Sequence, residues 1–384
     1  MKNKLAILTS HPIHVQAPLF RKLENTDQID LTVYFCWNQE KEKFYDEQFG
    51  LEYKWDVPVY EGYTYKHLFN LSPKPSSKFS GQINPGIVKE IIQNNYEAVI
   101  IFGWNSITNW LAAIACFITN TPLLIRSESP LHQEVKKEGW KQKIKKLIFE
   151  KFLFKYASAF LCIGEQNKKF YKFYGVPEER LFFTPYAVNN ERFQQSRKDL
   201  SDKISKFRNE LDIASEDVVV LFVGKLIHKK RPFDLLKAYQ KIVQKNSPQE
   251  GEAHLLFVGD GNLRSDLEEY ASENNLKNVH FVGFKNQTEL PKYYAISDIF
   301  VLPSGMGETW GLVVNEAMNF KLPVIVSDMV GSGYDLVQEG KNGFTFPVED
   351  INKLKENLEI LIKDDKKRKK IWKRISQNNK GLQL

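Results

Sequence analysis

Two glutamates, Glu308 and Glu316, stand eight positions apart in a glycine-rich segment, PSGMGETWGLVVNEAMNFKL at residues 303–322. The apolar run before this segment predicts a short buried strand, and the residues after Gly311 predict a helix. The N-terminus of such a helix presents unpaired N–H groups and a partial positive charge, which together can hold a phosphate. Carboxylates in the loop and in the helix can accept hydrogen bonds from hydroxyl groups. The segment therefore predicts a site for a sugar and a ribose on either side of a diphosphate; the structural alternative is a pair of acids that only offset the helix dipole.

Basic residues follow a second predicted strand, residues 218–223. Lys225 and Lys230 flank a turn that begins at Gly224, and Lys229 is adjacent to Lys230. Cations at this place suit a diphosphate. The alternative is a solvated basic loop.

A Gly-x-Gly pattern at Gly259 and Gly261 follows another predicted strand. A dinucleotide-binding fingerprint has a third glycine at the position where this chain has Arg264. Because a lone Gly-x-Gly is a weak signal, we interpret the pattern as a tight turn.

Both halves of the chain alternate short apolar runs with helical stretches. In the first half the predicted strands are residues 5–9, 31–35, 98–102, 123–126 and 159–163. In the second half they are residues 218–223, 254–259, 279–282, 299–302, 324–327 and 343–346. Such alternation predicts an α/β fold with a doubly wound parallel sheet in each half, in which ligands bind beyond the carboxyl ends of the strands.

The length of 384 residues and the hydrophobic content of 42% predict two globular domains. Apolar periodicity is lost near residues 185–217, which we interpret as a linker. The predicted domains are therefore residues 1–187 and 188–365, followed by a basic helix and tail at residues 366–384.

Features of several kinds favour a cytoplasmic protein. The three cysteines lie far apart, fit no zinc or redox spacing, and are predicted to be reduced packing residues. The apolar run after the basic start MKNKLAILTSHP is too short for a signal peptide. Residues 98–125 carry no charge and are long enough to span a bilayer, but Asn109 and Asn120 interrupt them, so a strand, a helix and a second strand explain the stretch better.

The formal net charge of +7 is compatible with nucleic acid, anionic lipid or an anionic substrate as a partner. Residues 136–155 interleave lysines with Trp140, Ile144, Leu147 and Phe152, the pattern of a basic amphipathic helix. Such a helix either lies on an anionic membrane surface, at the inner face of the cell membrane, or packs on the core with its lysines solvated. Because no nucleic-acid-binding motif occurs, nucleic acid is not an expected partner.

Residues 303–328 resemble the Glu-x7-Glu signature of retaining, nucleotide-sugar-dependent glycosyltransferases of family 4, which have the GT-B fold. LFVGKLIHKKRPFDLLKAY, residues 221–239, resembles the basic phosphate loop of that family, and residues 255–268 and 279–304 resemble the units that follow it. In the first half, TSHPIHVQAPLFRKL and FGWNSITNWLAA resemble one bacterial branch of the family.

The resemblance implies two Rossmann-like domains that face each other across a cleft. It also implies transfer of a sugar, with retention of configuration, from a UDP- or GDP-type donor to a hydroxyl group of a glycan or glycolipid acceptor. The setting would be synthesis of a bacterial surface polysaccharide or lipopolysaccharide. The chain has no Asp-x-Asp, so we expect neither a catalytic metal nor a cofactor besides the nucleotide sugar.

The resemblance also assigns roles to residues. Catalysis would involve Glu308, Lys225, Lys230 and His132, where His132 is the nearest histidine by order to one that binds the 6-hydroxyl of the transferred sugar. Lys225 stands where the family commonly has arginine. The donor-binding residues would be Gly224, Lys225, Lys230, Gly259, Phe284, Glu308, Trp310, Gly311, Leu312 and Glu316. Glu308 would contact the sugar, Glu316 the ribose, and backbone groups near Phe284 the nucleobase.

Four residues that follow predicted strands of the first half would line the acceptor side: His11, His14, Trp104 and Glu128. The alternative for the histidines is a hydrogen-bonded structural role. Two other functions use the same donor site: a GT-B-related sugar-nucleotide epimerase or hydrolase, and a non-catalytic partner that binds nucleotide or glycan in a synthesis complex.

Overall fold

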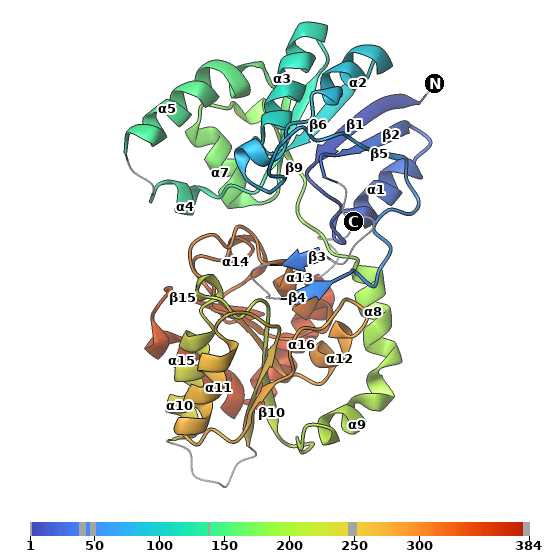
Figure 1. Ribbon diagram of the computed structural model, residues 1–384. Coiled ribbons are helices and arrows are strands. Elements are labelled where there is room, and N and C mark those ends of the chain that lie inside the picture. The colour runs from blue at the N-terminus through green and yellow to red at the C-terminus, as the bar shows by residue number, and fades with distance from the viewer. Residues whose placement is uncertain (1, 38–43, 47–50, 137–138, 245–251, 379–384) are drawn as a thin grey trace. The chain divides into compact units, whose positions relative to one another are not determined.

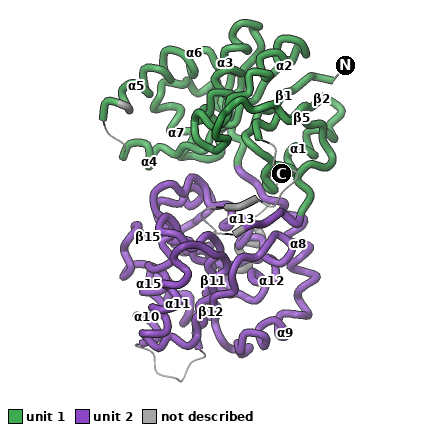
Figure 2. The backbone as a smooth tube through the Cα atoms, viewed as in Figure 1, with its two compact units in different colours: residues 1–44, 57–185 green, residues 45–56, 186–384 purple. Residues whose placement is uncertain are grey.

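The computed structural model describes residues 2–37, 44–46, 51–136, 139–244 and 252–378. The chain forms two compact units, shown in different colours in Figure 2. Unit 1 comprises residues 1–44 and 57–185, and unit 2 comprises residues 45–56 and 186–384. The units therefore divide after Pro185, and a short segment from the first half of the chain belongs to unit 2.

Within its described part, unit 1 contains a seven-stranded parallel sheet (Figure 1). The strand order is β5-β2-β1-β6-β7-β8-β9. All strands run parallel, but the order in which the chain adds them reverses between β1 and β6, as in a Rossmann-like fold. The strands are β1 (Asn3–Thr9), β2 (Ile29–Phe35), β5 (Tyr65–His67), β6 (Ala98–Phe102), β7 (Leu123–Ser127), β8 (Ala159–Cys162) and β9 (Leu181–Phe183). The five predicted strands are confirmed, and the two short edge strands, β5 and β9, were not predicted.

Helices connect the parallel strands of unit 1. They are α1 (Ala17–Glu24), α2 (Gly86–Asn94), α3 (Ile107–Thr119), α4 (Leu131–Glu134), α5 (Trp140–Ile148), α6 (Phe154–Tyr156) and α7 (Glu165–Phe173), with a π-helical turn (Phe149–Leu153) between α5 and α6. The charge-free stretch 98–125 is β6, α3 and the start of β7, as predicted. Ser106 caps α3 by accepting a hydrogen bond from the backbone of Asn109, and Asn120 ends the helix in a left-handed conformation. Within the described residues, no helix is both long and apolar enough to cross a membrane.

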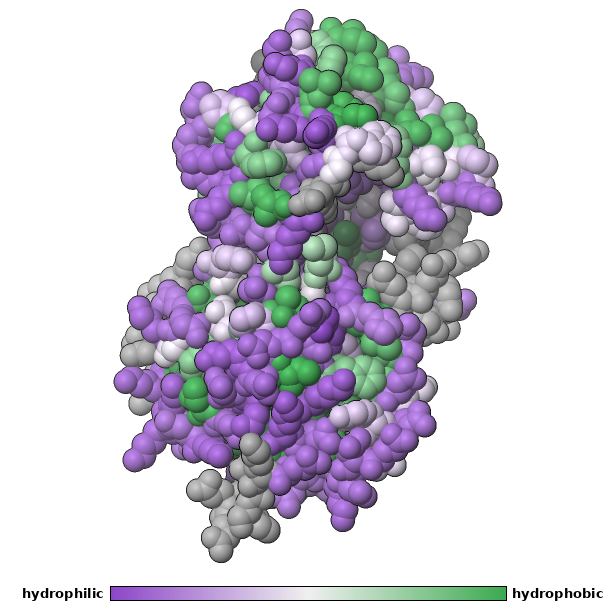
Figure 3. Space-filling view, turned by 90° about the vertical axis from the view of Figure 1, so that its left-hand side faces the viewer, coloured by the Kyte–Doolittle hydropathy of each residue, from purple (hydrophilic) through white to green (hydrophobic). Residues whose placement is uncertain are grey.

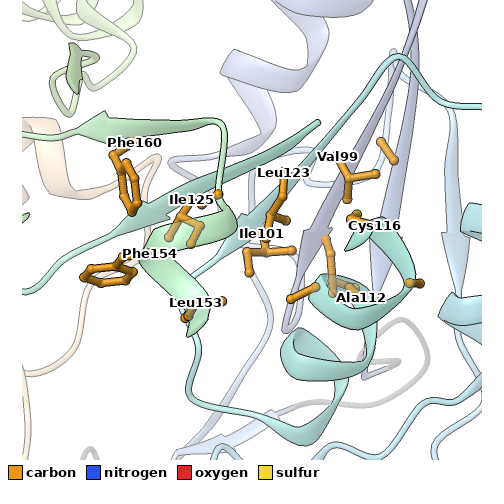
Figure 4. Close-up of a cluster of buried hydrophobic side chains, with 14 of the residues drawn as sticks. Val99, Ile101, Ala112, Cys116, Leu123, Ile125, Leu153, Phe154 and Phe160 are labelled. Atoms are coloured by element: carbon orange, nitrogen blue, oxygen red, sulfur yellow. The ribbon is translucent and has the colours of Figure 1, made fainter. Parts of the chain in front are cut away.

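A core of buried aliphatic and aromatic side chains packs between this sheet and its helices (Figure 4). Val99 and Ile101 of β6 lie beside Leu123 and Ile125 of β7, and α3 and the segment around Phe154 cover them. The cysteines belong to such packing: Cys36, Cys116 and Cys162 are all buried and form no disulfide. Burial raises the pKa of the Cys116 thiol to about 12, so this thiol is inert at neutral pH.

Unit 2 has, among its described residues, a six-stranded parallel sheet in the order β12-β11-β10-β13-β14-β15. This is the Rossmann order, with the reversal between β10 and β13. The strands are β10 (Val218–Val223), β11 (Ala253–Val258), β12 (Val279–Phe281), β13 (Ile299–Leu302), β14 (Val324–Ser327) and β15 (Gly343–Phe346). Every residue of β10, β11, β13 and β14 is buried, as expected for parallel strands covered on both faces. The six strands predicted for the second half are therefore confirmed.

The helices of unit 2 cover both faces of this sheet (Figure 1). They are α8 (Asn190–Asp199), α9 (Ile204–Asn209), α10 (Pro232–Val243), α11 (Arg264–Glu273), α12 (Leu290–Ala295), α13 (Leu312–Asn319), α14 (Gly333–Leu336), α15 (Ile351–Lys363) and α16 (Asp365–Asn378). The predicted basic helix after residue 365 corresponds to α16, and the predicted tail from residue 379 lies outside the described residues.

The prediction of a linker at residues 185–217 is wrong, because α8 and α9 occupy much of it. Phe193 is the buried residue of α8 and packs against the rings of Tyr294 and Phe320. Hydrogen bonds also hold α8; Arg197, for example, donates one to the carbonyl oxygen of Asn319. A helix that docks through one aromatic residue and hydrogen bonds has no apolar periodicity to detect.

Candidate functional site

The two predicted phosphate-binding motifs meet where the strand order of unit 2 reverses. Lys225 and Lys230 follow β10, and Glu308 follows β13, so both loops begin at the carboxyl ends of neighbouring strands. The backbone N–H of Gly305 donates a 2.7 Å hydrogen bond to the carbonyl oxygen of Lys229, which joins the loops directly. In open parallel sheets this reversal point is where ligands bind.

An ion pair links the loops: the Lys230 ammonium group donates a hydrogen bond to Glu308 Oε2. Both side chains are largely buried, with exposed fractions of 18% for Lys230 and 9% for Glu308. Burial alone would raise the pKa of Glu308, but Lys230, Lys229 and Ser304 outweigh it and lower this pKa. Glu308 is therefore ionised at neutral pH. The sequence predicted both residues as site residues but not that they contact each other.

Close backbone packing fixes the loops after β10 and β11. Gly259 has a φ of +144°, and a Cβ atom there would lie 1.9 Å from the carbonyl oxygen of Gly224. A Cβ on Gly261 would similarly lie 2.5 Å from the carbonyl oxygen of Leu226. The Gly-x-Gly pattern is thus a tight turn whose glycines permit backbone contact with the basic loop.

The glycine-rich loop leads into α13. Gly311 precedes this helix with a φ of +90°, and a Cβ there would lie 2.9 Å from Leu302 Cδ2. The first-turn N–H groups of α13 begin at Leu312, beside the loop that holds Glu308, and give that end a partial positive charge. Trp310 is 3% exposed, and its Nε1 donates a hydrogen bond to Asn315 Oδ1, so its indole braces the helix.

Glu316 lies in α13 and is buried. The hydroxyl of Tyr294 donates a 2.8 Å hydrogen bond to its Oε2. Burial raises the pKa of Glu316 to about 7, although the Tyr294 hydrogen bond and the charge of Arg192 act to lower it. Arg192 also donates to the backbone oxygen and to Oε1 of Gln287, at 3.2 and 2.6 Å. Tyr294 and Arg192 were not predicted as site residues, because they come from α12 and α8 and belong to no recognisable motif.

Phe284 lies in the loop that follows β12, immediately after Gly283, whose φ is +74°. Its ring centroid lies 4.8 Å from that of Tyr53, a residue of the short segment that joins unit 2 from the first half of the chain. Tyr53 was not predicted from the sequence, because only the tertiary structure brings it to Phe284.

The residues predicted for the acceptor side lie in unit 1. His11 is half-buried, its Nδ1 lies 2.8 Å from Ser10 Oγ, and burial lowers the pKa of its imidazole. His14 is half-buried in the turn before α1. Both therefore follow β1, at the carboxyl edge of the sheet, as the sequence predicted.

Trp104, Glu128 and His132 follow β6 and β7. Trp104 is part of the aromatic core, with ring centroids 4.8 Å from Phe149 and 5.8 Å from Phe170, so packing accounts for its type. Glu128 is exposed. His132 is half-buried at the start of α4, where its backbone N–H donates to Gln166.

Arg126 lies next to these residues and donates two 2.9 Å hydrogen bonds to Thr184, which fixes the end of unit 1. In the described part of the chain, no three His, Cys, Asp or Glu side chains form a metal-ligating group.

Comparisons with known proteins agree with this architecture. Residues 203–378 match the family model described as glycosyl transferases group 1. An uncharacterized glycosyltransferase of Methanocaldococcus jannaschii is 30% identical over 171 residues, which are 44% of this chain and 42% of that protein. CapM, a capsular polysaccharide biosynthesis glycosyltransferase of Staphylococcus aureus, is 26% identical over 266 residues, 68% of this chain and 66% of that protein.

The first curated relatives are matched over less than half of their own length. The likeness in structure is wider. The crystal structure of HepE from Anabaena in complex with UDP has a TM-score of 0.71 and 20% identity, over 98% of this chain and 94% of that chain. Residues 203–378 are thus similar to the glycosyl transferases group 1 family, and the two Rossmann-like units have the GT-B fold.

Proposed function

We propose that this chain is a glycosyltransferase that moves a sugar from a nucleoside-diphosphate donor to a hydroxyl group of a glycan or lipid-linked acceptor, with retention of configuration. The observation that carries the proposal is the buried ion pair of Lys230 and Glu308 at the reversal point of the unit 2 sheet. Lys230, a cation that can bind a diphosphate, and Glu308, an ionised hydrogen-bond acceptor for sugar hydroxyls, are thus held side by side.

The donor would place its diphosphate among Lys225, Lys230 and the first turn of α13. A UDP- or GDP-type donor fits the family, and the HepE structure of the same fold contains UDP. Glu308 neutralises Lys230 in the free protein. Because an ammonium group has three N–H donors, Lys230 can serve Glu308 and a phosphate oxygen together.

In the reaction, the bond between the anomeric carbon and the diphosphate oxygen breaks, and its electron pair stays on the diphosphate. Lys225, Lys230 and the α13 dipole stabilise this charge without reorganisation. The acceptor hydroxyl attacks the anomeric carbon from the side of the leaving group, and its proton passes to the departing diphosphate. Glu308 holds hydroxyl groups of the transferred sugar, and His132 serves the 6-hydroxyl. Because lysines and a helix terminus supply the positive charge, we propose that neither a catalytic metal nor a cofactor is needed.

The first test is transfer and hydrolysis of UDP- and GDP-sugars in EDTA, with glycan or lipid acceptors. Glu308→Gln should lower the transfer rate at least about 100-fold, because a neutral amide replaces the ionised hydrogen-bond acceptor. Glu356→Gln is the matched control, since Glu356 is an exposed residue of α15 that pairs with Lys353. Equal activity of the Glu308→Gln variant and the wild type would overturn the proposed role. Donor breakdown that no acceptor accelerates would favour the hydrolase alternative.

We propose in addition that the protein acts in the cytoplasm at the inner face of a membrane, through residues 136–155. In the structure, the helical segment from α5 to α6 packs on the core through the buried residues Phe149, Leu153 and Phe154. Its other side exposes Trp140, Ile144, Leu147 and Phe152 between lysines. Figure 3 faces the side of unit 1 that carries α5 and shows hydrophobic surface among hydrophilic side chains. Exposed apolar side chains and lysines together fit an anionic lipid surface.

Vesicle sedimentation tests this part. Binding to phosphatidylglycerol vesicles should exceed binding to phosphatidylcholine vesicles and fall with added salt. Leu147→Ser should weaken it several-fold, whereas Phe69→Ser, which changes an exposed aromatic residue outside the segment, should not. Equal binding to neutral vesicles would contradict the proposal.

A further inference from the structure

Residues 51–56 reach unit 2 from the first half of the chain. They lie between β2 and β5, which are strands of unit 1, yet residues 45–56 belong to unit 2. The chain therefore passes between the units after residues 44, 56 and 185. Within the segment, β4 (Leu51–Tyr53) pairs with β3 (Phe44–Asp46), and the residues after β4 dock on the loop that follows β12.

Hydrogen bonds in both directions hold residues 54–56 to this loop. Asn286 Nδ2 donates to the carbonyl oxygen of Lys54 at 2.6 Å, and the backbone N–H of Asp56 donates to Asn286 Oδ1 at 3.5 Å. The backbone N–H of Thr288 donates to Asp56 Oδ2 at 3.0 Å, and the Thr288 hydroxyl donates to the same oxygen. Each contact joins residues more than two hundred positions apart, so the docking is specific to the folded chain.

The docked segment adds aromatic rings to the loop. The Tyr53 ring lies 4.8 Å from Phe284, centroid to centroid, with an interplanar angle of 37°. Trp55 contacts Tyr53 edge to face at 5.0 Å and 78°. All three rings are half-buried, so each retains some exposed surface. Aromatic faces of this kind bind flat ring systems.

The aromatic rings belong to the same edge of the sheet as the diphosphate residues. The N–H of Gly259 donates to the carbonyl oxygen of Gly283 at 2.9 Å, and Gly259 packs on Gly224, so the loops after β10, β11 and β12 contact each other in sequence. Two strand spacings separate β10 from β12, about 10 Å. That distance suits a nucleoside, with the diphosphate at the basic loop and the base beyond the ribose.

An arginine bound to the same loop acts on Glu316, the residue predicted to hold the ribose. Arg192 donates to Gln287, within the loop, and its charge acts on the Glu316 carboxylate. The loop thus holds Arg192, whose charge acts on the residue predicted to hold the ribose, and it also binds residues 54–56 through hydrogen bonds.

We propose that Tyr53 and Phe284 form the nucleobase-binding surface of the donor site, and that Asn286, Thr288 and Asp56 hold Tyr53 in place. The inference rests on the proposed function, since it assigns the base of the same nucleotide. Residues 51–56 are then a specificity element, through which the first half of the chain contributes to donor binding in unit 2.

Calorimetric titration with a nucleoside diphosphate and with inorganic pyrophosphate tests this assignment. Tyr53→Ser should weaken UDP or GDP binding about tenfold or more, because a stacked base loses its aromatic partner, and leave pyrophosphate binding unchanged. Tyr53→Phe should retain binding. Asp56→Ala should weaken nucleotide binding several-fold, while the neighbouring exposed control, Glu52→Ala, should not.

Three outcomes would overturn the inference in distinguishable ways. If the Tyr53→Ser variant binds nucleotide as tightly as the wild type does, this inference alone is overturned. Equal weakening of nucleotide and pyrophosphate would show that Tyr53 supports the fold of the whole site and does not contact the base. Absence of nucleotide binding by the wild type would overturn the proposed function as well. Urea unfolding of each variant verifies that it is folded.

Discussion

At the scale of single residues, two buried carboxylates of one motif have opposite protonation tendencies. The pKa of Glu308 is lowered because the Lys230 and Lys229 charges outweigh burial. The pKa of Glu316 is raised to about 7 because burial outweighs a tyrosine hydroxyl and the charge of Arg192. Glu308 is therefore an ionised hydrogen-bond acceptor at neutral pH, whereas Glu316 is close to half protonated.

The buried ion pair of Lys230 and Glu308 should contribute to the stability of the fold. Lys230→Met should lower the free energy of unfolding by about 3–5 kcal/mol at pH 7, because it leaves Glu308 buried without its cation. The double variant with Glu308→Gln should recover most of this loss. Lys353→Met, in the exposed pair with Glu356, should change stability by no more than about 0.5 kcal/mol. Urea unfolding measures all four proteins; equal losses for the single and double variants would contradict a coupled pair.

The raised pKa of Glu316 should make the stability of the protein depend on pH. Its folded-state pKa lies above its unfolded value, so the stability it contributes is present at low pH and is lost as pH rises through about 7. Between pH 5 and pH 8 the free energy of unfolding of the wild type should fall by about 2 kcal/mol relative to Glu316→Gln. Tyr294→Phe removes a hydrogen bond that favours the ionised form of Glu316. The free energy of unfolding of this variant should therefore fall more than that of the wild type as pH rises. Parallel pH profiles of wild type and Glu316→Gln would refute the assignment.

At the scale of elements, backbone packing between loops positions the site. A Cβ at Gly259 would meet the backbone of the basic loop, whereas a Cβ at Gly340, which also has a positive φ, would meet nothing within 4 Å. The two glycines therefore share backbone strain but differ in contact.

Gly340→Ala should lower the free energy of unfolding by about 1–2 kcal/mol, from the left-handed backbone alone. Gly259→Ala should cost at least about 1 kcal/mol more, because the loops after β10 and β11 must separate. It should also weaken nucleotide binding, which Gly340→Ala should not. Thermal unfolding and calorimetry measure the two effects, and similar values for both variants would contradict loop packing as the cause.

The elements also show what sequence patterns can predict. The central strands were predictable because strands buried on both faces are continuous apolar runs, as β10 is. The edge strands β5 and β9 have three residues each, too few for a pattern. Helix α8 was missed because it docks through Phe193 and polar contacts. Within the site, Lys230 and Glu308 were predictable because they belong to recognisable motifs. Tyr294, Arg192 and Tyr53 were not, because they come from other elements and lie near the site only through tertiary packing.

At the scale of the whole molecule, the residues predicted to bind the nucleotide part of the donor all belong to unit 2. Nucleotide binding should therefore slow backbone hydrogen exchange most strongly at residues 51–56, 224–231, 283–288 and 303–316. Protection at 51–56 is the distinctive expectation, because more than a hundred residues of the chain separate this segment from the rest of unit 2. Protection confined to unit 1 would contradict the placement of the donor site.

The most direct test of the central claim is a thermal-shift panel of UDP, GDP, ADP and CMP in EDTA, because a ligand that binds the folded state raises the melting temperature by mass action. The predicted result is a shift with UDP or GDP that Lys230→Ala abolishes and Lys353→Ala leaves intact. A shift that requires added metal, or that Lys230→Ala leaves unchanged, would contradict a donor site built on the Lys230 and Glu308 pair.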